Sequence, residues 1–213
     1  SRRELADVFA SDADLVHFIG HCEDEGLQCA DGYLAVDDLA DVGVRTFFLN
    51  ACGSYREGRA LVRAGSVAGA VTFRDVLDGQ ATTVGTTFAR LLVRGFCIER
   101  ALRLARRRIR MGKDYAAVGD ATYAPAGDGT APVVVRVRET GESYEVAVEG
   151  MPDDAPGGVF RPPVVESERW HLRGRDAVGR MDADTLREAL AGTGLPVIHE
   201  NGFSWAAAFV EGL

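Results

Sequence analysis

Three hydrophobic runs in the first third of the chain have the pattern of buried β-strands. They are ADLVHFIG at 13–20, VRTFFLNA at 44–51 and SVAGAVTF at 66–73. Each is short and carries β-branched or aromatic residues, and the first two are apolar on both faces. Strands that are buried on both faces of a parallel sheet have such continuous apolar runs, whereas half-exposed strands alternate. We therefore predict three central strands of one largely parallel sheet.

Segments with helical spacing of apolar residues separate these runs. Gly65 and Gly95 follow two of them, where a helix ends readily on a glycine. The predicted helices cover residues 2–10, 57–65, 81–95 and 97–112, and a short last strand covers 114–120. Strands that alternate with helices predict an α/β layer with helices flanking the sheet.

The pattern changes near residue 125. Residues 133–150 alternate on both sides of ETGES, which predicts an antiparallel hairpin. A helix is expected over 183–194, with Asp182 or Asp184 as its N-cap. A second hairpin, with its turn at Asn201–Gly202, is expected near the end. We therefore predict two domains, an α/β core over 1–124 and a small α+β appendage over 125–213.

Composition and charge narrow the functional classes. The chain is 46% hydrophobic and 26% charged, as soluble globular proteins are, and no apolar run is long enough to span a bilayer. We expect a cytoplasmic protein with no membrane partner. The net charge of −8 repels polyanions, so no nucleic-acid partner is expected. Lys113 is the only lysine, a bias typical of salt-adapted proteins and of GC-rich genomes alike.

Two candidate catalytic residues end the first two predicted strands. His21 follows the strand at 13–20, and Cys52 follows the strand at 44–51. Functional side chains collect past the carboxyl ends of parallel strands, so neighbouring strands would bring the two together. A thiol is only slightly ionised at neutral pH, and an imidazole within reach takes its proton. The alternative is a small core cysteine and a hydrogen-bonded histidine with no chemical role.

Residues 13–124 resemble the CHAT family of caspase-like cysteine peptidases, which are relatives of separase. Six short motifs occur in the order typical of that family: HFIGH (17–21), LNAC (49–52), AGSVAGAV (64–71), VLD (76–78), FARLLVRG (88–95) and ALRLAR (101–106). The resemblance implies a caspase-like sheet and an endopeptidase that needs no metal or organic cofactor. It also implies that His21 and Cys52 are the catalytic pair, with protein or peptide as the substrate.

The resemblance further implies where a substrate and its oxyanion are held. Backbone N–H groups near Cys22 and Cys52 would form the oxyanion hole, and the peptide would lie as an added strand beside the third strand. Asp75 and Asp78 follow that strand and are candidates for selecting a basic residue at the cleaved position. Asn50 is expected to line the same pocket.

Two departures from the family pattern leave an inactive module as the alternative. The family usually has glycine where this chain has Cys22, and often an acidic residue where it has Gly53. A backbone angle that suits glycine would strain Cys22. We therefore keep a second hypothesis, a catalytically inactive caspase-like module that binds a peptide or protein partner.

The first predicted strand raises the question of a partner. The resemblance implies two further strands before it, so we expect this chain to be part of a longer protein or a processing product. A complementary polypeptide would supply the missing strands, because an unpaired sheet edge promotes aggregation.

The histidines and cysteines also allow two other readings. His17 lies on the same strand face as His21, where it either supports His21 or packs. A metal site from His17, His21, Cys22 and Cys29 is disfavoured, because their spacing matches no common zinc pattern. The four cysteines are expected to be free thiols.

Overall fold

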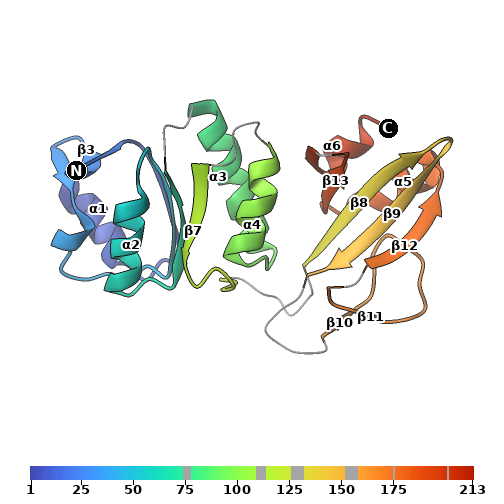
Figure 1. Cartoon of the computed structure of the whole chain (residues 1–213), viewed down its shortest axis with the longest axis horizontal. Helices are drawn as coiled ribbons and strands as arrows, with labels where there is room; N and C mark the ends of the chain where they lie inside the picture. The colour runs from blue at the N-terminus through green and yellow to red at the C-terminus, as the bar shows by residue number, and fades with distance from the viewer. Residues whose placement is uncertain (74–77, 109–113, 126–131, 152–157, 175, 201) are drawn as a thin grey trace. The chain divides into compact units, whose positions relative to one another are not determined.

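A computed structural model of the chain describes residues 1–73, 78–108, 114–125, 132–151, 158–174, 176–200 and 202–213 (Figure 1). The chain divides into two compact units, Ser1–Gly127 and Asp128–Leu213. None of the described helices is long and apolar enough to cross a membrane.

The first unit is built on a four-stranded sheet in the order β1-β5-β6-β7. Its strands are β1 (Leu15–Ile19), β5 (Thr46–Asn50), β6 (Ala68–Thr72) and β7 (Tyr115–Gly119). The β1–β5 and β5–β6 pairs are parallel, whereas β7 runs antiparallel to β6. A mixed α/β fold with parallel strands, as the sequence predicts, is thereby confirmed.

Helices cover both faces of this sheet (Figure 1). On one face lie α1 (Arg2–Ala10) and α2 (Tyr55–Ala64), and on the other lie α3 (Asp78–Val93) and α4 (Ile98–Ala105). Neighbouring side chains of β5 point to opposite faces of the sheet, because side chains alternate along a strand. Phe47 belongs to the core that contains Phe9 of α1, whereas Phe48 contacts Phe88 of α3. The predicted helix at 97–112 ends earlier, and a 3₁₀ turn, η2 (Arg106–Arg108), follows it.

β1 differs from the buried central strand that its composition predicts. It is the edge of the sheet in the described part of the chain, and only Val16 among its residues is buried. Ile19 is 56% exposed. In contrast, all five residues of β5 and of β6 are buried. The prediction of a central position is therefore wrong for β1 within this chain and right for β5 and β6.

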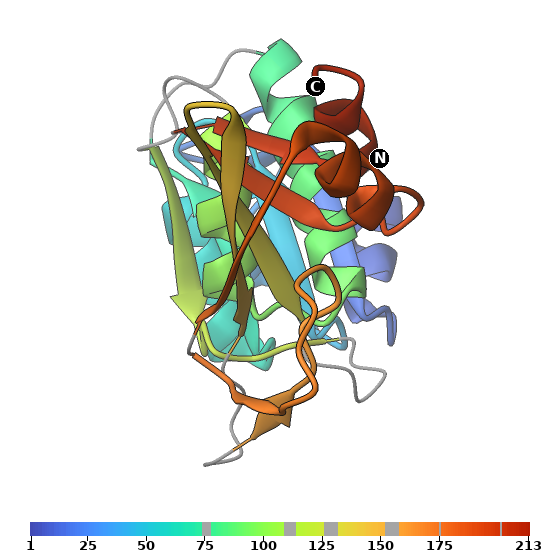
Figure 2. The same ribbon diagram turned by 90° about the vertical axis from the view of Figure 1, so that its right-hand side faces the viewer.

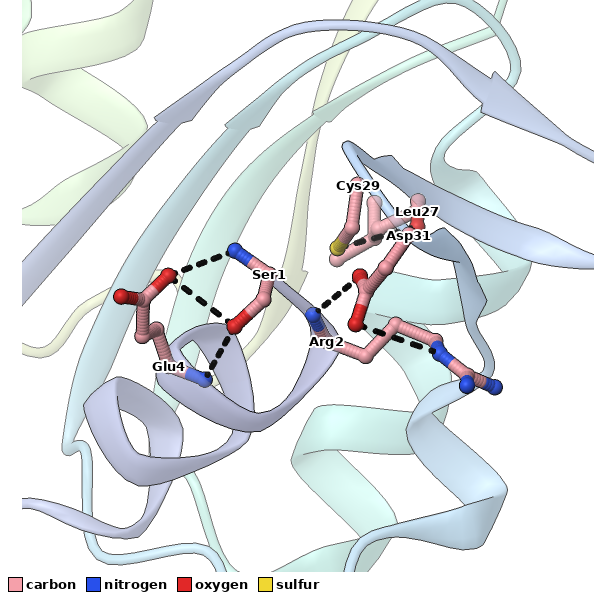
Figure 3. A network of polar contacts seen from close by, with 6 residues as sticks. All are labelled: Ser1, Arg2, Glu4, Leu27, Cys29 and Asp31. Carbon is pink, nitrogen blue, oxygen red and sulfur yellow. Dashed lines mark hydrogen bonds and ion pairs between the residues drawn. The ribbon is translucent and has the colours of Figure 1, made fainter.

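A small antiparallel sheet between β1 and β5 was not predicted. It consists of β2 (Cys22–Glu23), β3 (Gly26–Cys29) and β4 (Gly32–Leu34), and the 3₁₀ turn η1 (Val36–Asp38) follows it. Figure 3 shows how α1 is attached to it: the backbone N–H of Arg2 donates to Asp31, at 2.7 Å. Ser1 and Glu4 form a capping box at the start of the same helix.

The second unit is a five-stranded sheet in the order β12-β9-β8-β13-β14, with two helices (Figure 2). The elements are β8 (Val133–Thr140), β9 (Ser143–Gly150), β12 (Asp176–Met181), α5 (Ala183–Leu190), β13 (Pro196–His199), β14 (Gly202–Trp205) and α6 (Ala206–Val210), with β10 (Val159–Phe160) and β11 (His171–Leu172) as a separate pair. Leu186 and Leu190 of α5 and Ala206 of α6 share one core with the valines of β8 and β9.

The predictions for this unit are mostly confirmed. The hairpin at 133–150 forms, and Asp182 caps α5 by accepting from the backbone N–H of Thr185 at 2.8 Å. β13 and β14 pair antiparallel, as the second hairpin requires. The prediction is wrong beyond Trp205, where residues 206–210 form α6. Alanines at 206–208 favour a helix over a strand.

Candidate active site

The pairing of β1 with β5 brings the ends of these two strands to the same edge of the sheet. The strands are parallel, and Ile19 lies opposite Asn50 in the last paired position. The backbone N–H of Gly20 also donates to the carbonyl of Asn50. His21 and Cys52 each follow the last paired residue by two positions. Both therefore leave the sheet at its carboxyl edge from adjacent strands, as the sequence predicts.

The turn that carries Cys52 is fixed by hydrogen bonds to β5 and β6. Ser54 is fully buried, and its hydroxyl donates to the carbonyl of Leu49 at 2.8 Å and accepts from the N–H of Thr72 at 3.1 Å. The hydroxyl of Thr72 in turn donates to the carbonyl of Ala51. Cys52 itself is partly exposed. The thiol thus stands on an anchored turn with part of its surface open to solvent, directly before α2.

The backbone conformation of Gly53 accounts for a glycine directly after Cys52. Its φ is +70°, in the left-handed region, and a Cβ added there would meet nothing within 4 Å. The turn after Cys52 therefore favours glycine for its backbone conformation and not for space.

Replacing Gly53 by alanine is expected to lower the free energy of unfolding by about 1 kcal/mol, because a side chain disfavours this φ. Asparagine tolerates the left-handed region better, so Gly53→Asn should cost less. Urea unfolding of both variants measures the difference. Equal losses from the two substitutions would contradict the backbone explanation.

The residues after β1 form the other side of the site. His21 is exposed, and its carbonyl accepts from the N–H of Gln28 at 2.9 Å. Opposed residues of an antiparallel ladder alternate between hydrogen-bonded and non-hydrogen-bonded pairs. Cys22 lies opposite Leu27 in the next pair, so its backbone N–H points away from β3. That N–H group is free of the ladder and can serve an anion.

The backbone of Cys22 is not strained. Glu200 is the only non-glycine residue with a positive φ in the described part of the chain. Cys22 has an ordinary strand conformation at the start of β2. The strain expected there from the sequence is absent.

The thiol of Cys22 is a poor nucleophile. Burial raises its pKa to about 11, and the carboxylates of Glu57 and Glu23 act in the same direction, while Arg56 acts against them.

Iodoacetamide should alkylate Cys22 at pH 8 at least about tenfold more slowly than it alkylates an unstructured cysteine peptide, because so little thiolate is present. Since the pKa is raised, the rate should increase as the pH approaches about 11. Peptide mapping by mass spectrometry gives the rate at this position. A rate at pH 8 equal to that of the peptide would contradict the effect of burial.

Two side chains of α2 attach the β2–β3 hairpin and η1 to the segment that follows Cys52. Arg56 donates to the carbonyl of Asp24 at 3.0 Å, and the buried carboxylate of Glu57 accepts from the N–H of Val36 at 2.7 Å. The sequence analysis missed both residues. Glu57 could have been found from the sequence, because it is a charged residue on the apolar side of a predicted helix.

Asn50 does not line a substrate pocket in this structure. It is 3% exposed, its amide donates to the carbonyl of Ala81 at 2.7 Å, and its oxygen accepts from the hydroxyl of Tyr115 at 3.2 Å. Burial, with Cys52 and Asp114 adding to it, raises the pKa of Tyr115 to about 12. Asn50 and Tyr115 therefore support the sheet behind Cys52, and the expected substrate contact at Asn50 is corrected.

His17 packs. Its ring stacks on Phe48 with centroids 5.0 Å apart, and a Cβ at Gly85 of α3 would collide with it. The residue as a whole is exposed, but these neighbours shield part of its ring from water and lower the pKa of His17. These contacts favour the packing alternative over support of His21.

The predicted specificity residues are not tested by side-chain geometry. Asp75 lies outside the described residues, and Asp78 begins α3 with its side chain outside them. An aromatic pair lies beside this segment: Tyr55 and Phe73 are 37% and 48% exposed, with ring centroids 4.9 Å apart.

The four cysteines are free thiols. In the described ranges, no three His, Cys, Asp or Glu residues gather as a metal site.

No family model matches the chain, and no curated protein matches it.

Proposed function

We propose that the first unit is a cysteine endopeptidase of the caspase-like type, with Cys52 as nucleophile and His21 as base. One observation carries the proposal: two residues with complementary chemistry leave adjacent parallel strands at equivalent positions past the last paired residues, Ile19 and Asn50. The exposed imidazole and the partly exposed thiol are both accessible to a substrate. Neither needs a metal or organic cofactor for acyl transfer.

The chemistry follows from these two groups. His21 takes the thiol proton of Cys52, and the sulfur attacks the peptide carbonyl. The N–H groups of Cys22 and Cys52 stabilise the resulting oxyanion. His21 then protonates the leaving amine, and the carbon–nitrogen bond breaks to give a thioester. Water, deprotonated by His21, attacks the thioester and releases the acid product and the free thiol.

Membership of the CHAT family belongs to this proposal. Its support is the position of the motifs in the fold. HFIGH spans the end of β1, LNAC spans the end of β5, and the residues GAV lie within β6. FARLLV lies in α3, and ALRLA lies in α4. VLD begins with residues 76 and 77, which lie outside the described part of the chain. The other five motifs each fall on a strand or a helix of the first unit.

A complementary polypeptide is the second part of the proposal. The outer edge of β1 pairs with no other described strand, and Ile19 leaves an apolar side chain exposed there. A sheet edge offers a row of unpaired N–H and C=O groups to an extended segment. We infer that such a segment adds to the sheet beside β1.

The inactive module is the alternative, and one experiment separates it from the peptidase. The chain is incubated with a library of fluorogenic peptides in which each residue type is placed at the cleaved position. The peptidase proposal expects hydrolysis, strongest with Arg or Lys at that position if Asp75 and Asp78 select it. Binding of library peptides without hydrolysis would establish the module and reject the peptidase.

A further inference from the structure

The second unit contains a pocket of its own. Its volume is about 260 Å³, slightly below the range of about 300–1,000 Å³ typical of sites for drug-sized ligands. The pocket therefore suits a ligand of about the size of one amino acid. Its chemically distinctive lining consists of Glu139, Tyr144, His199, Glu200, Ser204 and Phe209.

Strand pairing and ring contacts hold these side chains in place. Glu139 lies opposite Tyr144 in the β8–β9 hairpin. His199 of β13 lies 3.2 Å from the hydroxyl of Ser204 through Nε2, and its ring centroid is 5.1 Å from that of Phe209 in α6. The lining thus comes from four strands of one sheet and from the helix α6.

The pocket is lined by acidic side chains and by no arginine or lysine among the described residues. Its two carboxylates are those of Glu139 and Glu200. The nearest arginines on β8 are paired elsewhere, Arg136 with Glu149 and Arg138 with Glu145. Both carboxylates are exposed, and in the described part of the chain neither forms an ion pair. They are therefore available to a ligand with positive charge.

The geometry points to a guanidinium group on a short aliphatic chain as the ligand of this pocket. A guanidinium pairs with carboxylates through two parallel N–H groups, and it stacks on aromatic rings such as those of Tyr144 and Phe209. It is also less strongly hydrated than an ammonium group, so the half-buried aromatic wall favours it. The same group occurs in a free small molecule and in the arginine side chain of a peptide.

Isothermal titration of the full chain tests the inference with four probes. They are arginine amide, lysine amide, citrulline amide and the blocked tripeptide Ala-Arg-Ala. Citrulline has the shape of arginine without the side-chain charge, so its amide should bind at least about tenfold more weakly than arginine amide. Lysine amide should lie between them, and added salt should weaken the binding of arginine amide.

The two arginine probes separate the sources of the ligand. Tighter binding of arginine amide supports a small molecule, and tighter binding of the tripeptide supports an arginine side chain. Citrulline amide that binds as tightly as arginine amide, or no binding of either arginine probe at millimolar concentration, would overturn the inference.

Variants tie the binding to this pocket. Glu139→Gln and Glu200→Gln should each weaken the binding of arginine amide about tenfold. Glu142→Gln removes the same charge from the exposed β8–β9 turn outside the lining and should leave the affinity unchanged. Equal effects of all three would show a general charge effect and reject the site. The readout is binding and not hydrolysis, so it does not depend on the peptidase proposal.

Discussion

Replacing Cys52 by alanine should reduce peptide hydrolysis at least about a thousandfold, because in the proposed mechanism the thioester forms on the sulfur of Cys52. The fold should remain, since the thiol is partly exposed and the turn is held by Ser54 and Thr72 rather than by sulfur. Hydrolysis of the best library peptide gives the loss in kcat/KM. Circular dichroism and the unfolding midpoint show whether the variant is folded.

Cys97→Ala is the matched control for this experiment. Cys97 is also a free, partly exposed thiol, but it precedes α4 and not α2. Its removal should leave kcat/KM within about twofold. Persistent hydrolysis in a folded Cys52→Ala variant would reject Cys52 as the nucleophile.

Replacing Phe48 by alanine should have the largest effect on stability. Its ring is fully buried on the α3 side of β5, where it stacks on His17 and contacts the edges of Phe88 and Tyr115. Truncation removes these contacts and leaves a cavity, which costs about 3–5 kcal/mol in a well-packed core. Phe48 lies two residues before Asn50, so the same change loosens the support behind Cys52.

The two tryptophans make the measurement specific for each unit. Trp170 and Trp205 both belong to the second unit, so their fluorescence during urea unfolding reports that unit. Circular dichroism reports both units. Phe48→Ala should shift the circular dichroism transition to lower urea and leave the fluorescence transition nearly unchanged.

Phe73→Ala removes the same ring from an exposed position. Phe73 is 48% exposed and contacts Tyr55, so its loss should cost less than about 1 kcal/mol. Equal shifts for Phe48→Ala and Phe73→Ala would contradict the packing described for the α3 side of the sheet.

The pattern of apolar residues predicts the central strands, because a strand that is buried on both faces is apolar at nearly every position. β5 and β6 are examples. The same continuous apolar pattern is misleading for β1, which has the residues of a central strand but lies at an edge of the described sheet. Sequence reports which residues favour burial and not which neighbour buries them. The small sheet at 22–34 was missed because two- to four-residue strands are too short to show a period.

The candidate site was predictable only in part, for a similar reason. The positions of His21 and Cys52 follow from strand order, which helix and strand alternation indicates. The support of their loops depends on long-range hydrogen bonds, such as those from Arg56 to Asp24 and from Asn50 to Ala81. No local pattern encodes these pairs. Asn50 was misassigned because strand alternation gives the face of a side chain but not what covers it.

The cooperation of His21 with Cys52 is the central claim, and the rate of covalent capture tests it most directly. A peptidyl chloromethyl ketone, which alkylates active thiols with loss of chloride, is added to the chain and to His21→Ala, and mass spectrometry follows the modification of each cysteine. The account predicts rapid capture at Cys52 in the unmodified chain and a rate at least about a hundredfold lower in His21→Ala. Equal rates in the two proteins would contradict it.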